Sequence, residues 1–288
     1  MAARGRLAEW LWLAPAGAIL LPFFVLPIGL LLRNSLLEDD SLTGIPGGSL
    51  GLRNYAAVLL DPFYSEVFLN TLGIAALIGV LAALVGYPYA VAVARASGTR
   101  QALLLWAVYT PLLVSVIVRA LGWIAITADG GVINQALLAL GAVGKPLRIL
   151  YEVEGMTLGM LHRYLPLMVL PVLGALQKIP RDLATASSTL GAGGVETFLR
   201  VTLPLSLPGV VIGFQLVFAS VLSDYVLPFL MGTTRFRMLA PALYDEAVAN
   251  QAMASASAMA VSALLLVLAI LAGSALASRR LMPWARAR

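Results

Sequence analysis

Six long apolar stretches, nearly free of charged side chains, limit this chain to a membrane fold. The first, Trp10–Leu32, and the last, Ala247–Ser278, contain no charged residue. About 20 apolar residues are enough to cross the hydrocarbon core of a bilayer. Charged residues make up only 11% of the chain, against about 25% in soluble domains. The sequence therefore predicts an all-α membrane protein with six transmembrane helices.

We expect the whole chain, 1–288, to form a single transmembrane domain. Its predicted spans are about 11–33, 67–94, 102–126, 156–177, 205–231 and 255–278. The first span follows Arg4 and Arg6, as the apolar core of a secretory signal peptide would. It is too long for such a core, and Arg33 ends it without a small-residue cleavage site. We interpret it as a retained helix, bent near Pro22 and Pro27.

The basic residues predict how the spans are oriented. With the N-terminus inside and sides alternating, the inner segments hold 11 basic residues: Arg4, Arg6, Arg95, Arg100, Lys178, Arg181, Arg200, Arg279, Arg280, Arg286 and Arg288. The outer segments hold six: Arg33, Arg53, Lys145, Arg148, Arg235 and Arg237. Lys and Arg are enriched in cytoplasmic loops. Both termini, and the polar segment between the fourth and fifth spans, are therefore expected in the cytoplasm.

That polar segment, 179–204, is predicted to fold as a helix–turn–helix. Pro180 and Asp182 are typical of a helix start, and Leu183–Leu190 follows as a short helix. Glycines at 191, 193 and 194 allow a sharp reversal. Val195–Val201 forms a second helix, which exposes Glu196 and Arg200 and buries Phe198. Such a shape would lie as a compact knob on the membrane surface.

The pattern of this segment resembles the cytoplasmic coupling loop of permease subunits in binding-protein-dependent ABC importers. The family motif has Glu-Ala-Ala, then a glycine, a phenylalanine and Leu-Pro. The matching positions are Thr185, Ala186, Ser187, Gly191, Phe198, Leu203 and Pro204. Thr185 stands where the family has glutamate, and Ser187 stands where it has the second alanine.

Four further blocks, in order around the loop, are similar to the spermidine/putrescine-type branch of these permeases. They are Arg119–Trp123 (RALGW), Gly130–Asn134 (GGVIN), Tyr164–Pro171 (YLPLMVLP) and Ser223–Gly232 (SDYVLPFLMG). The resemblance covers the chain from about Trp12 to Met282.

The resemblance implies a permease of the bacterial inner membrane with three kinds of partner subunit. It would work with a second permease subunit, two cytoplasmic ATPase subunits and an extracytoplasmic solute-binding protein. The residues implied in ATPase coupling are Thr185, Ala186, Ser187, Gly191, Ala192, Glu196, Phe198, Leu203 and Pro204. The implied substrate is a polyamine, and related permeases carry phosphonates, ferric ions, sulfate or amino acids.

The residue content agrees with a subunit that binds no cofactor of its own. The chain has no cysteine and a single histidine, His162, which excludes thiolate and multi-histidine metal sites. It also lacks the GxxxxGK[ST] phosphate loop. ATP would therefore be hydrolysed by a partner subunit.

Two rival functions have less support. An intramembrane enzyme needs a constellation such as HExxH or paired aspartates, and neither occurs in the spans. A self-powered secondary transporter has no use for a coupling loop.

Three ionisable residues interrupt the spans: Arg119, Arg163 and Asp224. All three are expected in the outer half of the membrane at similar depth. Charges inside a membrane are costly and usually face a protein interior or water. They could form a polar cluster at the translocation path, with Arg119 or Arg163 paired to Asp224 as a gate. Alternatively, the arginines snorkel to the outer interface and Asp224 caps a helix break before Pro228.

Small residues in the later spans predict close helix packing. Gly155 with Gly159, and Gly209 with Gly213, have GxxxG spacing. The partner helix could belong to this chain or to a second permease subunit.

Overall fold

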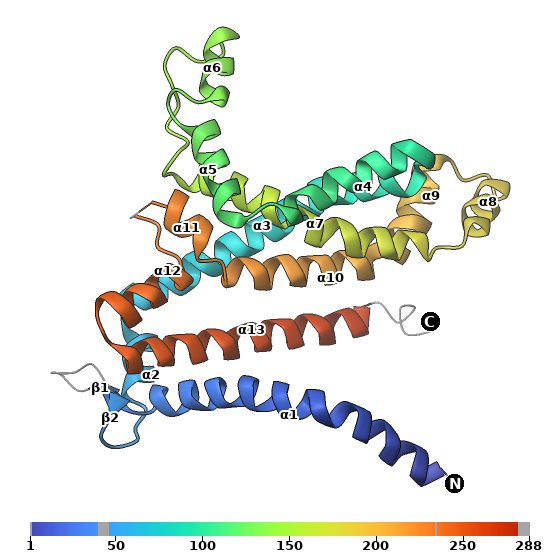
Figure 1. Ribbon diagram of the computed structural model, residues 1–288. Coiled ribbons are helices and arrows are strands. Elements are labelled where there is room, and N and C mark those ends of the chain that lie inside the picture. The colour runs from blue at the N-terminus through green and yellow to red at the C-terminus, as the bar shows by residue number, and fades with distance from the viewer. Residues whose placement is uncertain (1, 40–45, 234, 282–288) are drawn as a thin grey trace. The chain divides into compact units, whose positions relative to one another are not determined.

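The computed structural model describes residues 2–39, 46–233 and 235–281, and most of these residues are helical (Figure 1). Their contacts divide the chain into two compact units. The terminal unit consists of Met1–Ser65 with Leu243–Leu266, and the central unit of Glu66–Ala242 with Val267–Arg288. Arg286, Arg288 and Asp40, which enter the charge arguments, lie outside the described residues.

The terminal unit contains the long helix α1 (Ala2–Ser35), a two-stranded antiparallel pair and the short helix α2 (Arg53–Leu60). The strands are β1 (Glu38–Asp39) and β2 (Pro46–Gly47). The amide of Asn54 donates to the carbonyls of Ser35 and Leu37, 3.1 and 2.5 Å away. The first bond satisfies a carbonyl at the end of α1 that has no helical partner, and the second holds the segment just after the helix.

The later part of the terminal unit begins with the end of α12 (Leu239–Tyr244) and a π-helical turn, η2 (Asp245–Ala249). The long helix α13 (Met253–Leu281) then starts in this unit and continues into the central one. The carboxylate of Asp39 accepts the N–H groups of Ala254 and Ser255, at 2.7 and 3.3 Å. A carboxylate at this position accepts N–H groups that have no partner within the helix, and the positive end of the helix dipole stabilises its charge.

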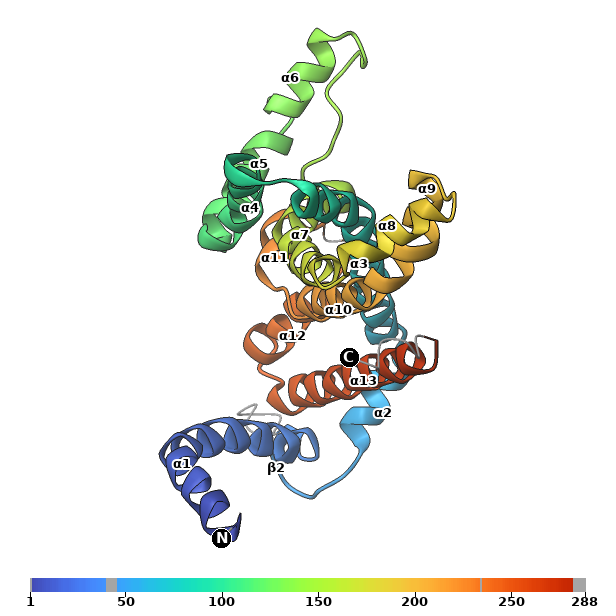
Figure 2. The same ribbon diagram turned by 90° about the vertical axis from the view of Figure 1, so that its right-hand side faces the viewer.

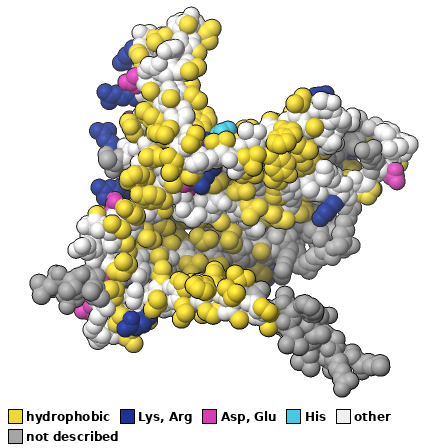
Figure 3. Space-filling model, viewed as in Figure 1, with side chains coloured by type: hydrophobic (Ala, Val, Ile, Leu, Met, Phe, Trp, Pro, Cys, Tyr) yellow, Lys and Arg dark blue, Asp and Glu magenta, His cyan; other side chains and the backbone are white. Residues whose placement is uncertain are grey.

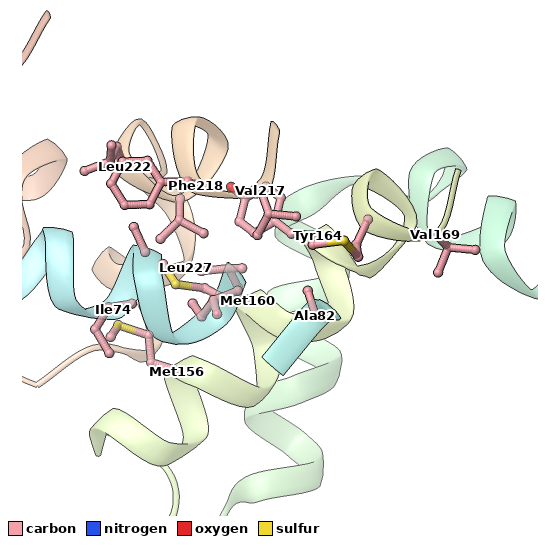
Figure 4. Close-up of a cluster of buried hydrophobic side chains, with 14 of the residues drawn as sticks. Ile74, Ala82, Met156, Met160, Tyr164, Val169, Val217, Phe218, Leu222 and Leu227 are labelled. Carbon is pink, nitrogen blue, oxygen red and sulfur yellow. The ribbon is translucent and has the colours of Figure 1, made fainter. Parts of the chain in front are cut away.

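The central unit is organised around three long helices that lie side by side (Figures 1 and 2). They are α3 (Pro62–Arg95), α7 (Val153–Gln177) and α10 (Leu203–Leu222). Figure 4 shows their buried side chains meeting in one core. Ile78 of α3, Met160 of α7 and Val217 of α10 are fully buried.

Two glycines bring α10 into backbone contact with α7. A Cβ atom on Gly209 would lie 2.7 Å from the Pro171 carbonyl oxygen, and one on Gly213 would lie 3.1 Å from the Met168 Cα atom. Only residues without a side chain fit at these distances. The small-residue spacing at these positions therefore serves packing within the chain.

Other elements of the central unit adjoin these three helices or project from them. They are α4 (Gly98–Leu113), α5 (Val116–Thr127), α6 (Val132–Ala139), α8 (Arg181–Thr189), α9 (Gly194–Thr197), the π-helical turn η1 (Phe198–Thr202) and α11 (Val226–Met231). In both views α5 and α6 extend away from the bundle (Figures 1 and 2). Hydrophobic side chains cover much of the exposed sides of α4 and α5 (Figure 3).

The range 102–126, expected as one span, is divided into α4 and α5. Val114 has an extended backbone, with φ −85° and ψ 134°, and Ser115 follows outside both helices. Pro111 lies in the last turn of α4, where its missing N–H weakens the helix. The stretch predicted as the third span thus consists of two helices in the structure.

Six segments of the described residues are long and apolar enough to cross a membrane. They are Gly17–Ser35, Pro62–Arg95, Val116–Ala139, Val153–Gln177, Gly194–Leu222 and Met253–Ser278. The all-α fold with six membrane-crossing segments agrees with the sequence-based prediction. The single-domain organisation over 1–288 stays a prediction.

We predict that Gly209→Ala weakens the contact between α7 and α10. The new Cβ would lie 2.7 Å from both the Pro171 oxygen and the Ala175 Cβ, and overpacking of this kind costs about 1–3 kcal/mol. Thermal unfolding in detergent would measure the loss. Gly174→Ala is the control, since its Cβ meets no atom within 4 Å. Equal unfolding midpoints for the two variants would contradict the close contact.

Candidate functional site

The segment between α7 and α10 folds as a helix–turn–helix, which we call the knob and define as residues 181–202. Its turn is a Schellman motif at the end of α8. Gly191 has φ +86°, its N–H donates to the Ser188 carbonyl at 3.0 Å, and the Ala192 N–H donates to the Ser187 carbonyl at 3.1 Å. Residues with a Cβ are disfavoured at this φ, so the reversal depends on glycine at this position.

A pair of hydroxyl groups joins the two arms of the knob. Ser187 Oγ of α8 and Thr197 Oγ1 of α9 are hydrogen-bonded, with 2.8 Å between the oxygens. An alanine at position 187, as in the family motif, could not make this bond. The departure from the motif thus has a local structural role.

The exposed surface of the knob carries an ion pair and a threonine. Arg200 and Glu196 are 3.1 Å apart, and their side chains are 79% and 46% exposed. Pairs this exposed contribute about 0–1 kcal/mol. Thr185 is exposed as well.

The knob also exposes apolar side chains beside a hollow. Leu190 is 88% exposed, Val195 74% and Leu199 53%. The hollow has a volume of about 430 Å³. Its lining residues are Leu183, Ala186, Ser187, Leu190, Gly191, Ala192, Glu196, Arg200 and Val201. Exposed apolar side chains next to polar ones are typical of a protein-binding surface.

The knob continues into α10 through η1, in which the Leu203 N–H donates to the Phe198 carbonyl five residues earlier. Pro204 follows directly. In a regular α-helix its ring would clash with the carbonyl of Arg200, and the wider π-helical turn relieves that crowding. Phe198 is half-buried and meets the ring of Tyr87 edge-on, with 5.9 Å between centroids. The knob is thus in contact with α3 as well as joined to α7 and α10.

Asp224 pairs with Arg163 in the central unit. Arg163 Nη1 lies 3.1 Å from Oδ1 and 3.3 Å from Oδ2, and the Asp224 side chain is only 1% exposed. Oδ1 also accepts the Val226 N–H at 3.1 Å, at the start of α11. Asp224, which lies between α10 and α11, therefore caps the start of α11. Its ion pair with Arg163 connects this interhelical segment to α7. The ion pair with Arg163 and the cap on α11, which the sequence analysis treated as parts of two alternatives, are thus both present.

Arg119 does not join this pair. Its Nη2 donates to the Val114 carbonyl, 2.8 Å away, at the break between α4 and α5. Among the described residues its buried Nε has no hydrogen-bond partner. Nearby, Trp123 Nε1 of α5 donates to His162 Nδ1 of α7 at 3.2 Å. Whether Arg119, Arg163 and Asp224 line a path or form a gate stays a prediction.

The hydroxyls of Tyr87 and Ser206 are hydrogen-bonded to each other, and neither residue belongs to a motif recognised in the sequence. The only signal was Tyr-Pro-Tyr at 87–89, two hydroxyl-bearing residues within an apolar run. In the described residues no group of three or more His, Cys, Asp or Glu could hold a metal ion.

We predict that the Arg163–Asp224 pair contributes to stability as a unit. Arg163→Gln alone leaves a buried carboxylate without its counter-ion, which costs about 3–5 kcal/mol. Adding Asp224→Asn, which keeps the carbonyl that caps α11, should restore most of the loss. Thermal unfolding in detergent would give the values.

The matched control is Arg53→Gln, which breaks an exposed pair with Glu38 at 3.6 Å and should cost at most about 1 kcal/mol. Strict additivity of the Arg163 and Asp224 changes would show that the two side chains act independently.

Comparisons with known proteins place this geometry in context. The model of the family described as "Binding-protein-dependent transport system inner membrane component" matches residues 155–282, which include the knob. The chain is 34% identical over 211 residues to the spermidine/putrescine transport system permease protein PotB of Salmonella typhimurium (strain SL1344). That match covers 73% of this chain and 72% of PotB.

Two solved structures share the fold over nearly the whole chain. One is a bacterial ABC transporter involved in the import of the acidic polysaccharide alginate, with a TM-score of 0.73, 16% identity, and coverage of 97% of this chain and 98% of that chain. The other is a bacterial alginate ABC transporter in complex with an alginate pentasaccharide-bound periplasmic protein. Its TM-score is 0.71 at 17% identity, covering 96% and 94% of the two chains.

Proposed function

Because the chain belongs to the family of binding-protein-dependent transport system inner membrane components, we propose that its knob receives the movement of separate ATPase subunits. The protein is a permease subunit of an ABC importer in the inner membrane. Members of this family are transport subunits, so the alternative of an intramembrane enzyme is discarded.

The observation that carries the proposal is the construction of the knob. It presents exposed leucine and valine side chains beside a hollow, as a surface that binds a partner would. At its base, Phe198 contacts α3 and the chain continues directly into α10. A force on the exposed end would therefore reach two of the core helices.

The proposed assembly has four kinds of component. Since the sequence contains no GxxxxGK[ST] loop, two cytoplasmic ATPase subunits would bind and hydrolyse ATP. A second permease subunit, identical or homologous, would complete the translocation path. An extracytoplasmic binding protein would deliver the solute. The chain itself would bind no cofactor.

We propose that both termini and the knob face the cytoplasm. The bias of 11 inner against six outer basic residues supports this orientation. It also puts the knob on the side where ATP is available.

We propose a polyamine as the substrate. The name of the PotB relative supports this choice. The outer segments also carry ten carboxylates: Glu38, Asp39, Asp40, Asp61, Glu66, Asp129, Glu152, Glu154, Asp245 and Glu246. An excess of acidic groups over the six basic ones raises the local concentration of cations. Phosphonate, ferric ion, sulfate and amino acids are the alternative substrates.

The substrate is tested with the assembled importer in proteoliposomes, supplied with the binding protein of the same system. Labelled spermidine and putrescine should be taken up only with ATP. Spermidine should also stabilise the binding protein against heat, since a ligand that binds only the folded state raises its melting temperature. Stabilisation by one of the other solutes instead would overturn the polyamine assignment while leaving the permease role intact.

For the coupling role, we predict that Gly191→Val abolishes ATP-driven uptake while the subunit still inserts. Valine is strongly disfavoured at φ +86°, by about 1–3 kcal/mol, so the turn must change its shape. Uptake and ATPase stimulation by the loaded binding protein are the measurements.

Gly193→Val is the matched control. Gly193 has φ −69° and ψ 167°, which valine adopts without strain, and its Cβ meets nothing within 4 Å. Full uptake by both variants would refute the role of the turn.

A further inference from the structure

Tyr87 of α3 contacts the chain on both sides of Pro204. Its ring meets Phe198 of η1 edge-on, at an interplanar angle of 73°. Its hydroxyl is hydrogen-bonded to Ser206 Oγ of α10, with 2.7 Å between the oxygens. Ser206 is fully buried, and its hydroxyl also lies 3.1 Å from the Leu203 carbonyl. One side chain of α3 thus holds the junction between the knob and α10.

Tyr89, two residues later, contacts a different helix. Its hydroxyl donates to the Leu104 carbonyl of α4 at 2.8 Å. Residues two apart on an α-helix are related by a rotation of about 200° around the helix axis, so Tyr87 and Tyr89 point to nearly opposite sides of α3. Together they connect η1 and α10, through α3, to α4.

Pro88 separates the two tyrosines within the 34-residue helix α3. It has no N–H to donate to the Leu84 carbonyl, so the helix is weakened at this point. Two residues before Pro88, Gly86 packs closely against α7: a Cβ atom added to Gly86 would lie 3.0 Å from Met168 Cγ. The contact between α3 and the knob junction therefore occurs where α3 is easiest to bend and where α7 constrains it.

The junction is also irregular on the knob side. η1 is π-helical, and single π-helical turns are frequent at functional sites because their hydrogen-bond register is not that of the flanking helix. The π-helical turn accommodates Pro204, but packing alone does not need the hydrogen bond between the half-buried Tyr87 and the buried Ser206.

We propose that Tyr87, Pro88 and Tyr89 form a transmission joint that carries movement of the knob into α3 and α4. Tyr87 is its positioning residue: it holds the knob junction against α3 by its ring and by its hydroxyl. The inference rests on the proposed coupling function and deepens it, by naming the residues through which the membrane helices respond.

The test uses the complete importer, with its ATPase subunits and binding protein, in proteoliposomes. Tyr87→Leu removes the ring contact and the hydroxyl bond. We expect this variant to assemble and to keep basal ATP hydrolysis, but to lose about tenfold in uptake and in stimulation by the loaded binding protein. The control is Tyr109→Leu on α4, whose side chain is 43% exposed and outside the joint. Uptake and stimulation by Tyr87→Leu equal to those of the control would overturn the proposal.

Two milder substitutions test the transmission joint if the importer with Tyr87→Leu does not assemble. Tyr87→Phe and Ser206→Ala each remove one hydroxyl of the same pair while retaining the ring contact. Each should reduce uptake about threefold, and the double variant should be no worse than either single one, because partners in one hydrogen bond are not additive. Unchanged uptake in both, or multiplied losses in the double variant, would refute the joint.

Failure of the coupling function itself is distinguishable. In that case the unmodified chain would neither bind an ATPase subunit nor show stimulated hydrolysis. With an intact, coupled complex and an active Tyr87→Leu variant, only the joint is rejected.

Discussion

The close contact between α7 and α10 is the interaction on which the central unit depends. At Gly209 and Gly213 the two helices meet without an intervening side chain on α10, so many atoms on both surfaces are at contact distance. α7 leads into the knob and α10 leads out of it. Because α7 and α10 are packed against each other, the two ends of the knob are held close together. Met160 and Val217, which belong to the hydrophobic core, lie on the same two helices.

The ionisable residues of the membrane segments have a common structural logic. The guanidinium of Arg119, a residue of α5, donates to the carbonyl at the end of α4, and the carboxylate of Asp224 accepts the Val226 N–H at the start of α11. Each side chain thus pairs with a backbone group that a helix end leaves without a helical partner. Two segments that would otherwise be continuous spans are interrupted in this way. The interruptions leave polar backbone groups inside an apolar region, and these side chains supply partners for some of them.

The sequence predicted the parts of the site that depend on local chemistry. Gly191 and the prolines around the knob indicated its helices and turn, and α8 lies within two residues of the expected range. The second helix begins near the expected position but continues through η1 into α10 instead of ending at Val201. The break at Val114 was missed because Pro111 and Ser115 lie within a long apolar run that predicts one span, and the hydrogen bond from Arg119 to the Val114 carbonyl depends on the fold. The three ionisable residues were predicted to cluster because they lie at similar depth in the membrane. Depth does not determine the direction in which each side chain points. The choice of Arg163 over Arg119 as partner of Asp224, and the Tyr87 contacts, follow from tertiary packing.

The bond between Ser187 and Thr197 has a consequence for the conditions under which the knob keeps its shape. Both groups are neutral hydroxyls, which neither titrate in the physiological range nor attract counter-ions. The spacing of the two arms is thus insensitive to ionic strength and to proton concentration. Salt screens exposed charges and therefore weakens the surface ion pair of Glu196 with Arg200 rather than this bond. An importer built this way would keep the same mechanical linkage while the salt content of its surroundings varies.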